Sequence, residues 1–78
     1  MIIHSPKELA VVVNNQRKQK NISQSEAGSM VGLKQATVSK FETHPDTTQL
    51  ATLFRILSAL DLEMTIAAKQ KKRWIEEW

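Results

Sequence analysis

Apolar residues recur at helical spacing from the start of the chain. Leu9, Val12 and Val13 stand at positions i, i+3 and i+4, which is the apolar stripe of an amphipathic helix. The dipeptide Ser5-Pro6 precedes them, and serine caps free N–H groups while proline suits the first helical position. The pattern therefore predicts a helix from Ser5-Pro6 to about Gln19.

Two shorter helices follow. Residues 23–26 read Ser-Gln-Ser-Glu, a capping box in which the serine and the glutamate each satisfy a free N–H group of the next helix. Gly32 ends that helix just after Met30-Val31. A third helix is expected from Gln35 to Thr43, and it ends at 44–46, because the residue before a proline avoids the helical region.

A fourth segment carries the clearest apolar stripe. We expect Thr47 or Thr48 to cap a helix that runs to about Leu60. Its apolar residues follow i, i+3, i+4, i+7 and i+10, which predicts that they face the core, with dimer packing at the helix end. These residues are Leu50, Leu53, Phe54, Leu57 and Leu60.

The period then changes to two. Leu62, Met64 and Ile66 alternate with Glu63, Thr65 and Ala67, which is typical of a half-buried strand. A single strand cannot satisfy its own backbone groups, and a helical domain offers it no sheet. We therefore expect the same strand of a second copy to pair with it; a further turn of helix is the alternative. Three parts result: a helical domain over 1–61, a dimerising strand over 62–68 and a tail over 69–78.

Length and composition narrow the function classes. A chain of 78 residues is a single small domain, for which only ~60% of the unfolded surface is buried on folding. The absence of cysteine excludes disulfides and Cys-based metal sites, so oligomerisation is the remaining way to add stability. His4 and His44 lack ligand-like spacing and are expected on the surface. We expect no metal, no cofactor and no enzymatic activity, because no nucleophile–base pair or phosphate loop is visible.

The expected location is a reducing cytoplasm. No apolar run approaches 18 residues, so we expect no contact with a membrane, and the first residues lack the features of a signal peptide. Residues 1–40 hold six lysines or arginines against two acidic residues. A basic half in a small domain is typical of a nucleic-acid binder, although solvated basic helices produce the same balance.

Residues 24–42 have the layout of a helix-turn-helix. Gly28 lies four residues before Gly32, where two helices approach closely, and Val38 lies six residues after the turn, where it packs the second helix on the first. A plain helical hairpin is the alternative. The outer face of the second helix is small and polar, and its Gln, Lys and Ala side chains suit adenine, guanine and the thymine methyl group. Thr43 and Thr47 are equally suited to phosphate contacts and to loop caps.

The motif resembles the helix-turn-helix of Cro/CI-type (XRE) repressors, which are lambda-repressor-like. The stretches GLKQATVSKFE, PDTTQLATLFRIL and LDLEMTI extend the likeness over about residues 5–67. In these stretches, and in its final Glu77-Trp78, the chain resembles the HipB-like antitoxins of HipBA-type toxin–antitoxin modules. It departs from them at Ala27-Gly28, which replace the usual Leu-Ala pair, and in a basic tail with an extra Trp74.

The resemblance implies a homodimer that binds palindromic operator DNA, represses its own operon and neutralises a HipA-like Ser/Thr kinase. It implies base contacts from Lys34, Gln35, Ala36 and Ser39. Phosphate contacts are expected from Arg17, Lys18, Ser23, Gln24, Ser25, Thr37 and Lys40. The dimer interface is expected at Leu62, Met64 and Ile66, and kinase docking at Trp74 and Trp78.

Alternatives stay open for the function of the protein and for the role of its tail. A stand-alone repressor or a restriction–modification controller has the same motif and needs no kinase. The tail is either a partner-binding segment, a solvated end with chance aromatics, or an arm that contacts DNA.

Overall fold

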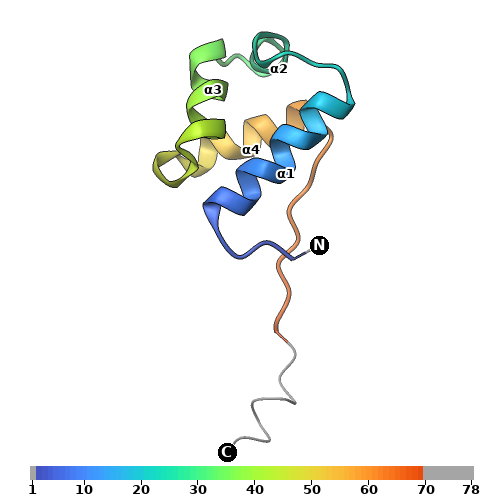
Figure 1. Ribbon diagram of the computed structural model, residues 1–78, viewed down its shortest axis with the longest axis vertical. Helices are drawn as coiled ribbons and strands as arrows, with labels where there is room; N and C mark the ends of the chain where they lie inside the picture. The colour runs from blue at the N-terminus through green and yellow to red at the C-terminus, as the bar shows by residue number, and fades with distance from the viewer. Residues whose placement is uncertain (1, 70–78) are drawn as a thin grey trace, which may run out of the picture.

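The computed structural model describes residues 2–69, and within this range the domain is entirely helical (Figure 1). The order is α1 (Pro6–Gln19), α2 (Gln24–Met30), α3 (Gln35–Thr43), a 3₁₀ turn η1 (Pro45–Thr47) and α4 (Leu50–Ala59). The four helices expected from the sequence are confirmed. None of the helices in this range is long and apolar enough to cross a membrane.

Local capping chemistry fixes the first two helix starts as expected. Ser5 Oγ accepts a hydrogen bond from the Glu8 N–H at 3.1 Å, and Ser23 with Glu26 forms the complete capping box, at 3.0 and 2.8 Å. The predicted cap of the fourth helix is wrong. Gln49 occupies that position, because Pro45 begins η1 and the Thr47 hydroxyl donates to the His44 carbonyl oxygen instead.

The core lies where α4 packs beneath the other helices. Its largest fully buried side chains are those of Phe41, Ile56, Leu60, Val13 and Val38. Two members of the predicted stripe are not core: Leu50 is 68% exposed and Phe54 is 52% exposed. The buried arc of α4 includes Ile56, which shifts its centre away from Leu50 and Phe54 and leaves both at its outer edge.

Residues beyond α4 leave the domain in an extended path. Asp61 has a φ of 56°, and the Leu62 N–H returns to the Leu57 carbonyl oxygen at 2.9 Å, which ends the helix. Leu62 packs against the core, but Met64 and Ile66 are exposed. Residues 62–69 contain no strand in this single chain, since a strand requires a partner backbone that one copy does not contain.

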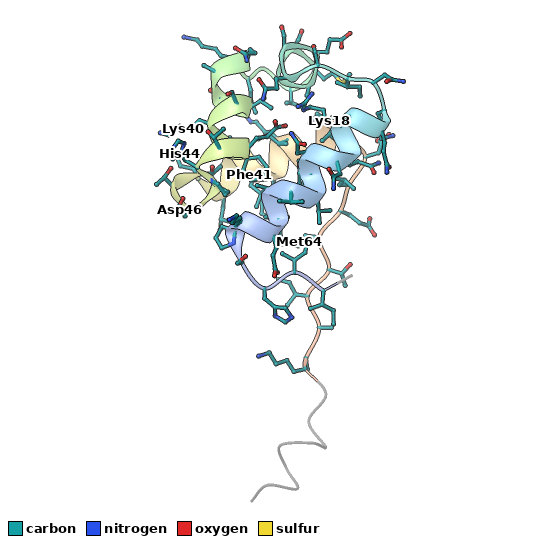
Figure 2. All side chains as sticks on the ribbon, in the orientation of Figure 1. Lys18, Lys40, Phe41, His44, Asp46 and Met64 are labelled. Atoms are coloured by element: carbon teal, nitrogen blue, oxygen red, sulfur yellow. The ribbon has the colours of Figure 1, made fainter. Side chains whose placement is uncertain are left out.

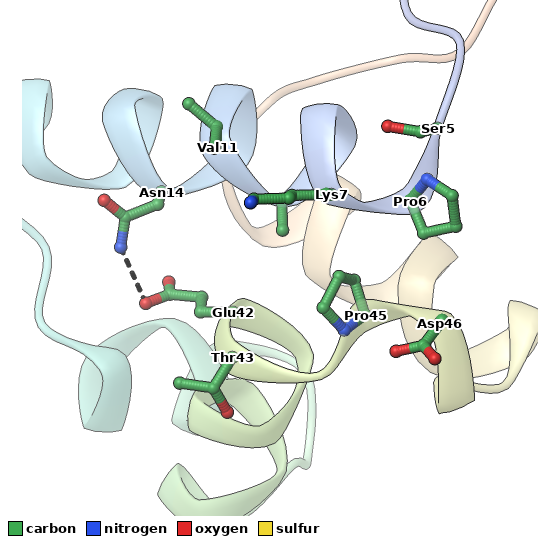
Figure 3. A pocket seen from close by; sticks show the side chains of 10 residues that line it. Ser5, Pro6, Lys7, Val11, Asn14, Glu42, Thr43, Pro45 and Asp46 are labelled. Carbon is green, nitrogen blue, oxygen red and sulfur yellow. Dashed lines mark hydrogen bonds between the residues drawn. The ribbon is translucent and has the colours of Figure 1, made fainter.

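A buried carboxylate joins α1, α2 and α3. The Glu42 side chain is only 6% exposed and accepts hydrogen bonds from Arg17 Nε at 2.7 Å and Arg17 Nη2 at 3.1 Å. Asn14 Nδ2 at 2.8 Å and Gln24 Nε2 at 2.9 Å donate to its Oε1 atom (the Asn14 bond is dashed in Figure 3). These residues form the Glu42 network, in which every donor comes from another helix.

The Glu42 network changes the acidity of its carboxyl group. Burial alone raises the pKa of Glu42, but hydrogen bonds from Arg17, Gln24 and Asn14 outweigh it and hold the pKa below its ordinary value of 4.5. The pKa of the exposed Glu26 is also lowered, by the hydrogen bonds that it exchanges with the Ser23 backbone and side chain.

Arg17, a predicted phosphate contact, has its guanidinium engaged within the domain. Its side chain is 11% exposed, and Nη1 donates to the Ile22 carbonyl oxygen at 2.9 Å while the other two nitrogens bind Glu42. A guanidinium committed to a buried carboxylate and a carbonyl does not turn outward without leaving both unpaired.

The lowered pKa of Glu42 predicts acid sensitivity. The unfolded state binds more protons than the folded state as pH falls below 4.5, so the unfolding free energy should drop through the folded pKa. Glu42→Gln should flatten this pH dependence and cost about 3 kcal/mol at pH 7, because Arg17 loses its buried anion. Urea unfolding from pH 7 to pH 3 measures both effects. The exposed Glu63→Gln is the control, and an unchanged acid slope in Glu42→Gln would contradict the assignment.

Candidate nucleic-acid interface

Two glycines shape the turn between α2 and α3. A Cβ atom on Gly28 would lie 2.5 Å from the Leu33 carbonyl oxygen and 3.3 Å from Val38 Cγ2, so only glycine fits without backbone movement. Gly32 has a φ of +73°, a conformation that favours glycine. The Leu33 N–H donates to the Gly28 carbonyl oxygen at 2.8 Å and closes the turn. The close approach predicted for Gly28 is confirmed.

The turn presents one face of α3 to solvent. Val38 and Phe41 are each 1% exposed and hold the opposite face against the core, as expected. Lys34, Gln35, Ala36 and Lys40 are exposed, and Ser39 is half-buried between them. The structure therefore brings the four predicted base-contact residues together on one polar surface at the start of α3, which we call the α3 face.

A hydrogen-bond relay orients Gln35 on the α3 face. Gln35 Nε2 donates to Gln24 Oε1 at 2.7 Å, and Gln24 Nε2 in turn donates to Glu42. Gln24 is the first residue of α2, so one side chain spans the two helices of the motif. The relay fixes the direction of an exposed glutamine that would otherwise sample several rotamers.

The other predicted phosphate contacts surround the α3 face. Lys18 is exposed in the last turn of α1, and Ser23 and Ser25 are exposed at the start of α2. The Ser23 hydroxyl oxygen accepts from Glu26, which leaves its hydrogen free to donate. Thr37 is half-buried in the first turn of α3, and Lys40 is exposed one turn later.

Potential metal ligands and the two histidines were the other candidates for binding chemistry. Residues 2–69 contain no group of three potential metal ligands. His4 and His44 are both exposed, as expected. Trp74 and Trp78, the predicted kinase-docking residues, lie outside the described residues.

Sequence reasoning missed the relay and the network behind it. Glu42 ends the motif one residue after the buried Phe41, and that position beside a core residue was the available signal. Its partners Asn14 and Arg17 are 28 and 25 residues away, a separation at which local patterns predict no pairing.

The chain is similar to known helix-turn-helix proteins. A Helix-turn-helix family model (HTH_3) matches residues 13–66. Antitoxin HipB of Escherichia coli O6:H1 strain CFT073 is 47% identical over 64 residues, which cover 82% of this chain and 68% of that protein. Antitoxin HipB of Escherichia coli strain K12 is 47% identical over 64 residues, covering 82% of this chain and 73% of that one.

Solved structures agree with this likeness. A HipB-O4 20mer complex contains a chain that superposes with a TM-score of 0.86 at 43% identity, covering 90% of this chain and 99% of that one. A HipA-HipB-O2-O3 complex contains one with a TM-score of 0.87, also at 43% identity and with the same coverage. A family model over more than half of the residues, and relatives at this identity and coverage, establish that the chain belongs to the helix-turn-helix family and, within it, to the HipB antitoxins.

Proposed function

We propose that this protein is a sequence-specific DNA-binding antitoxin that represses its own operon. It binds palindromic operators as a homodimer and neutralises a HipA-like Ser/Thr kinase, and it acts on the nucleoid in the bacterial cytoplasm. The observation that carries the proposal is the α3 face, where Gln24 holds Gln35 in a defined direction at 2.7 Å. Its role is binding, in keeping with a family that is typically non-enzymatic.

Lys34, Gln35, Ala36 and Ser39 read base edges in the major groove. Gln35 uses one amide N–H on Gln24, and its Oε1 atom and second N–H remain available. An acceptor and a donor side by side are what a bidentate contact to adenine N6 and N7 requires. Lys34 suits guanine O6 and N7, and the Ala36 methyl group suits the thymine methyl group.

Phosphate contacts hold the α3 face in register. We assign them to side chains with a free donor around that face: Lys18, Ser23, Gln24, Ser25, Thr37 and Lys40. Gln24 Nε2 carries a second hydrogen besides the one directed at Glu42, so a single residue can support Gln35 and bind the backbone.

The homodimer forms through the segment after α4. Met64 is 41% exposed and lines the same surface hollow as the outward Phe54, and Ile66 is 90% exposed. Paired strands over 62–67 from two copies would cover Met64 and Ile66 together with Leu62. A HipB-like dimer places its two recognition helices about one turn of DNA apart, about 34 Å. The two-fold symmetry of the dimer is the reason that the operator is a palindrome, and the helix spacing sets the separation of its half-sites.

The kinase partner is proposed from the relatives and the tail. HipA accompanies HipB in one of the similar solved complexes. Trp74 and Trp78 are assigned as the docking residues because tryptophan is enriched among the side chains that dominate interface energetics.

The α3 face predicts that base-contact and phosphate-contact residues have different effects on DNA binding. Gln35→Ala should relax sequence preference at one base pair by about 1–3 kcal/mol, because it removes a bidentate contact. Lys18→Ala should weaken all DNA sequences alike and reduce the log–log salt slope by about 0.9 for each lost phosphate contact. Titrations of operator and scrambled DNA at several salt concentrations separate the two outcomes. If Gln35→Ala weakened all sequences alike and Lys18→Ala relaxed sequence preference, the motif would dock on DNA in a different orientation.

The paired strand predicts that dimerisation depends on one face of residues 62–67. Ile66→Lys should shift the protein toward monomer, because a charge cannot be buried without a partner, and operator affinity should fall with it. Thr65→Lys, on the alternate face, is the matched control. Sedimentation velocity measures both variants, and a dimer that tolerates Ile66→Lys would exclude this interface.

The tail predicts that kinase binding and DNA binding are separable. A chain that ends at Lys72 should lose co-purification with the kinase encoded by the adjacent gene while its operator affinity is unchanged. Loss of operator binding instead would make the tail a DNA-contacting arm. If the full chain binds its palindrome but captures no kinase, it is a stand-alone repressor.

A further inference from the structure

The exposed surface of α3 continues past the base-reading residues to its C-terminal end. Thr43 lies one turn after Ser39 and is exposed, as is His44, the residue that ends the helix. The His44 N–H donates to the Lys40 carbonyl oxygen at 2.7 Å, which fixes the backbone at this point. Figure 2 shows Lys40 and His44 on the same outer edge of α3.

The hydrogen bonds of Thr43 determine which imidazole nitrogen carries the proton. Thr43 Oγ1 lies 3.0 Å from the Ser39 carbonyl oxygen and 3.0 Å from His44 Nδ1. A hydroxyl group has one hydrogen, and the Ser39 carbonyl can only accept it. Oγ1 therefore accepts from Nδ1–H, so in the neutral ring Nε2 holds a lone pair and is the nitrogen left for another partner.

We infer that His44, oriented by Thr43, is a further phosphate-binding residue for operator DNA, which becomes a donor to phosphate only when its ring is protonated. A neutral Nε2 atom cannot donate to a phosphate oxygen, whereas the protonated ring donates from Nε2 and still donates from Nδ1 to Thr43. Histidine is the side chain whose charge changes between about pH 5 and pH 8. Operator affinity therefore increases as the solution is acidified through this range.

The protein's own charges around His44 are of both signs, so a DNA phosphate would add the main charge that favours the protonated ring. Lys40 precedes His44 by one turn of α3, and Asp46 follows it in η1. On α1, Lys7 lines the groove of Figure 3 together with Thr43 and Asp46, while Glu42 is directed at Arg17. Cationic and anionic side chains are thus both found near this end of α3. The C-terminal end of a helix favours a cation, and an approaching phosphate adds the negative charge that stabilises the protonated ring.

The inference rests on the proposed operator binding, so the experiment tests the two separately. Operator affinity is measured for the full chain at pH 8, 7 and 6. Binding at pH 8 tests the proposed function, and the gain in affinity on acidification tests the inferred His44 contact. From pH 8 to pH 6 we expect an increase of about tenfold for a dimer with two exposed charge pairs. The log–log salt slope should steepen by about 1.8, which is 0.9 for each new phosphate contact.

The chain has only two histidines, which provides a matched control. His44→Asn should lose the gain in operator affinity between pH 8 and pH 6, while His4→Asn should keep it. A gain that persists in His44→Asn would overturn the inference. Nitrogen-15 NMR of the imidazole at pH 8 should show the Nδ1–H tautomer for His44 and a shift toward Nε2–H in Thr43→Val. An Nε2–H tautomer in the wild type would overturn the site equally.

Discussion

The arrangement of the first three helices depends on one buried carboxylate. Glu42 on α3 receives donors from Arg17 and Asn14 on α1 and from Gln24 on α2, and its side chain is 6% exposed. Burying an ion is costly unless its lone pairs are satisfied, and here four hydrogen bonds offset that cost. Such an arrangement tolerates few alternatives, because rotating any one helix leaves a buried charge unpaired. Apolar contacts alone would allow more freedom.

The same network extends to the surface that we assign to DNA. From Glu42 it passes through Gln24 to Gln35, so an exposed side chain is connected by two hydrogen bonds to the interior. Ordering a free glutamine at the moment of binding costs conformational entropy. Part of that cost is already met during folding, because Gln24 holds the amide of Gln35. The stability of the domain and the precision of base reading therefore share one set of bonds.

Local signals in the sequence were sufficient for most of the helices. The Ser23 and Glu26 capping box, the turn at Gly32 and the break before Pro45 depend on neighbours within a few residues, so patterns identify them. The start of α4 was missed because η1 takes up residues that were expected to cap it. Phe54 was placed in the core because the stripe omitted Ile56, and the centre of a buried arc depends on what packs against it.

The pairing of Arg17 with Glu42 could not be predicted from local patterns in the sequence. A basic residue near the start of the motif fits a phosphate contact as well as an internal ion pair, and only the fold brings Glu42, 25 residues later, to 2.7 Å from it. The strand expected over 62–68 is a different case, because the described residues contain no strand and the hydrogen-bond partners of such a strand would belong to another chain. Its alternating pattern predicts a partner without identifying it.

The residues at the start of α3 can be substituted more freely than Gln24 at the start of α2. Lys34, Ala36 and Gln35 project from α3, and the core beneath them is built by Val38 and Phe41. Under the proposed function, substitution of these three residues should alter which bases are read and leave the core packing intact. Gln24 has no such freedom, because its amide is both a donor to Glu42 and the acceptor for Gln35. A change of operator preference that keeps the fold is accordingly expected at the start of α3 and not at the start of α2, although we assign DNA contacts to both helices.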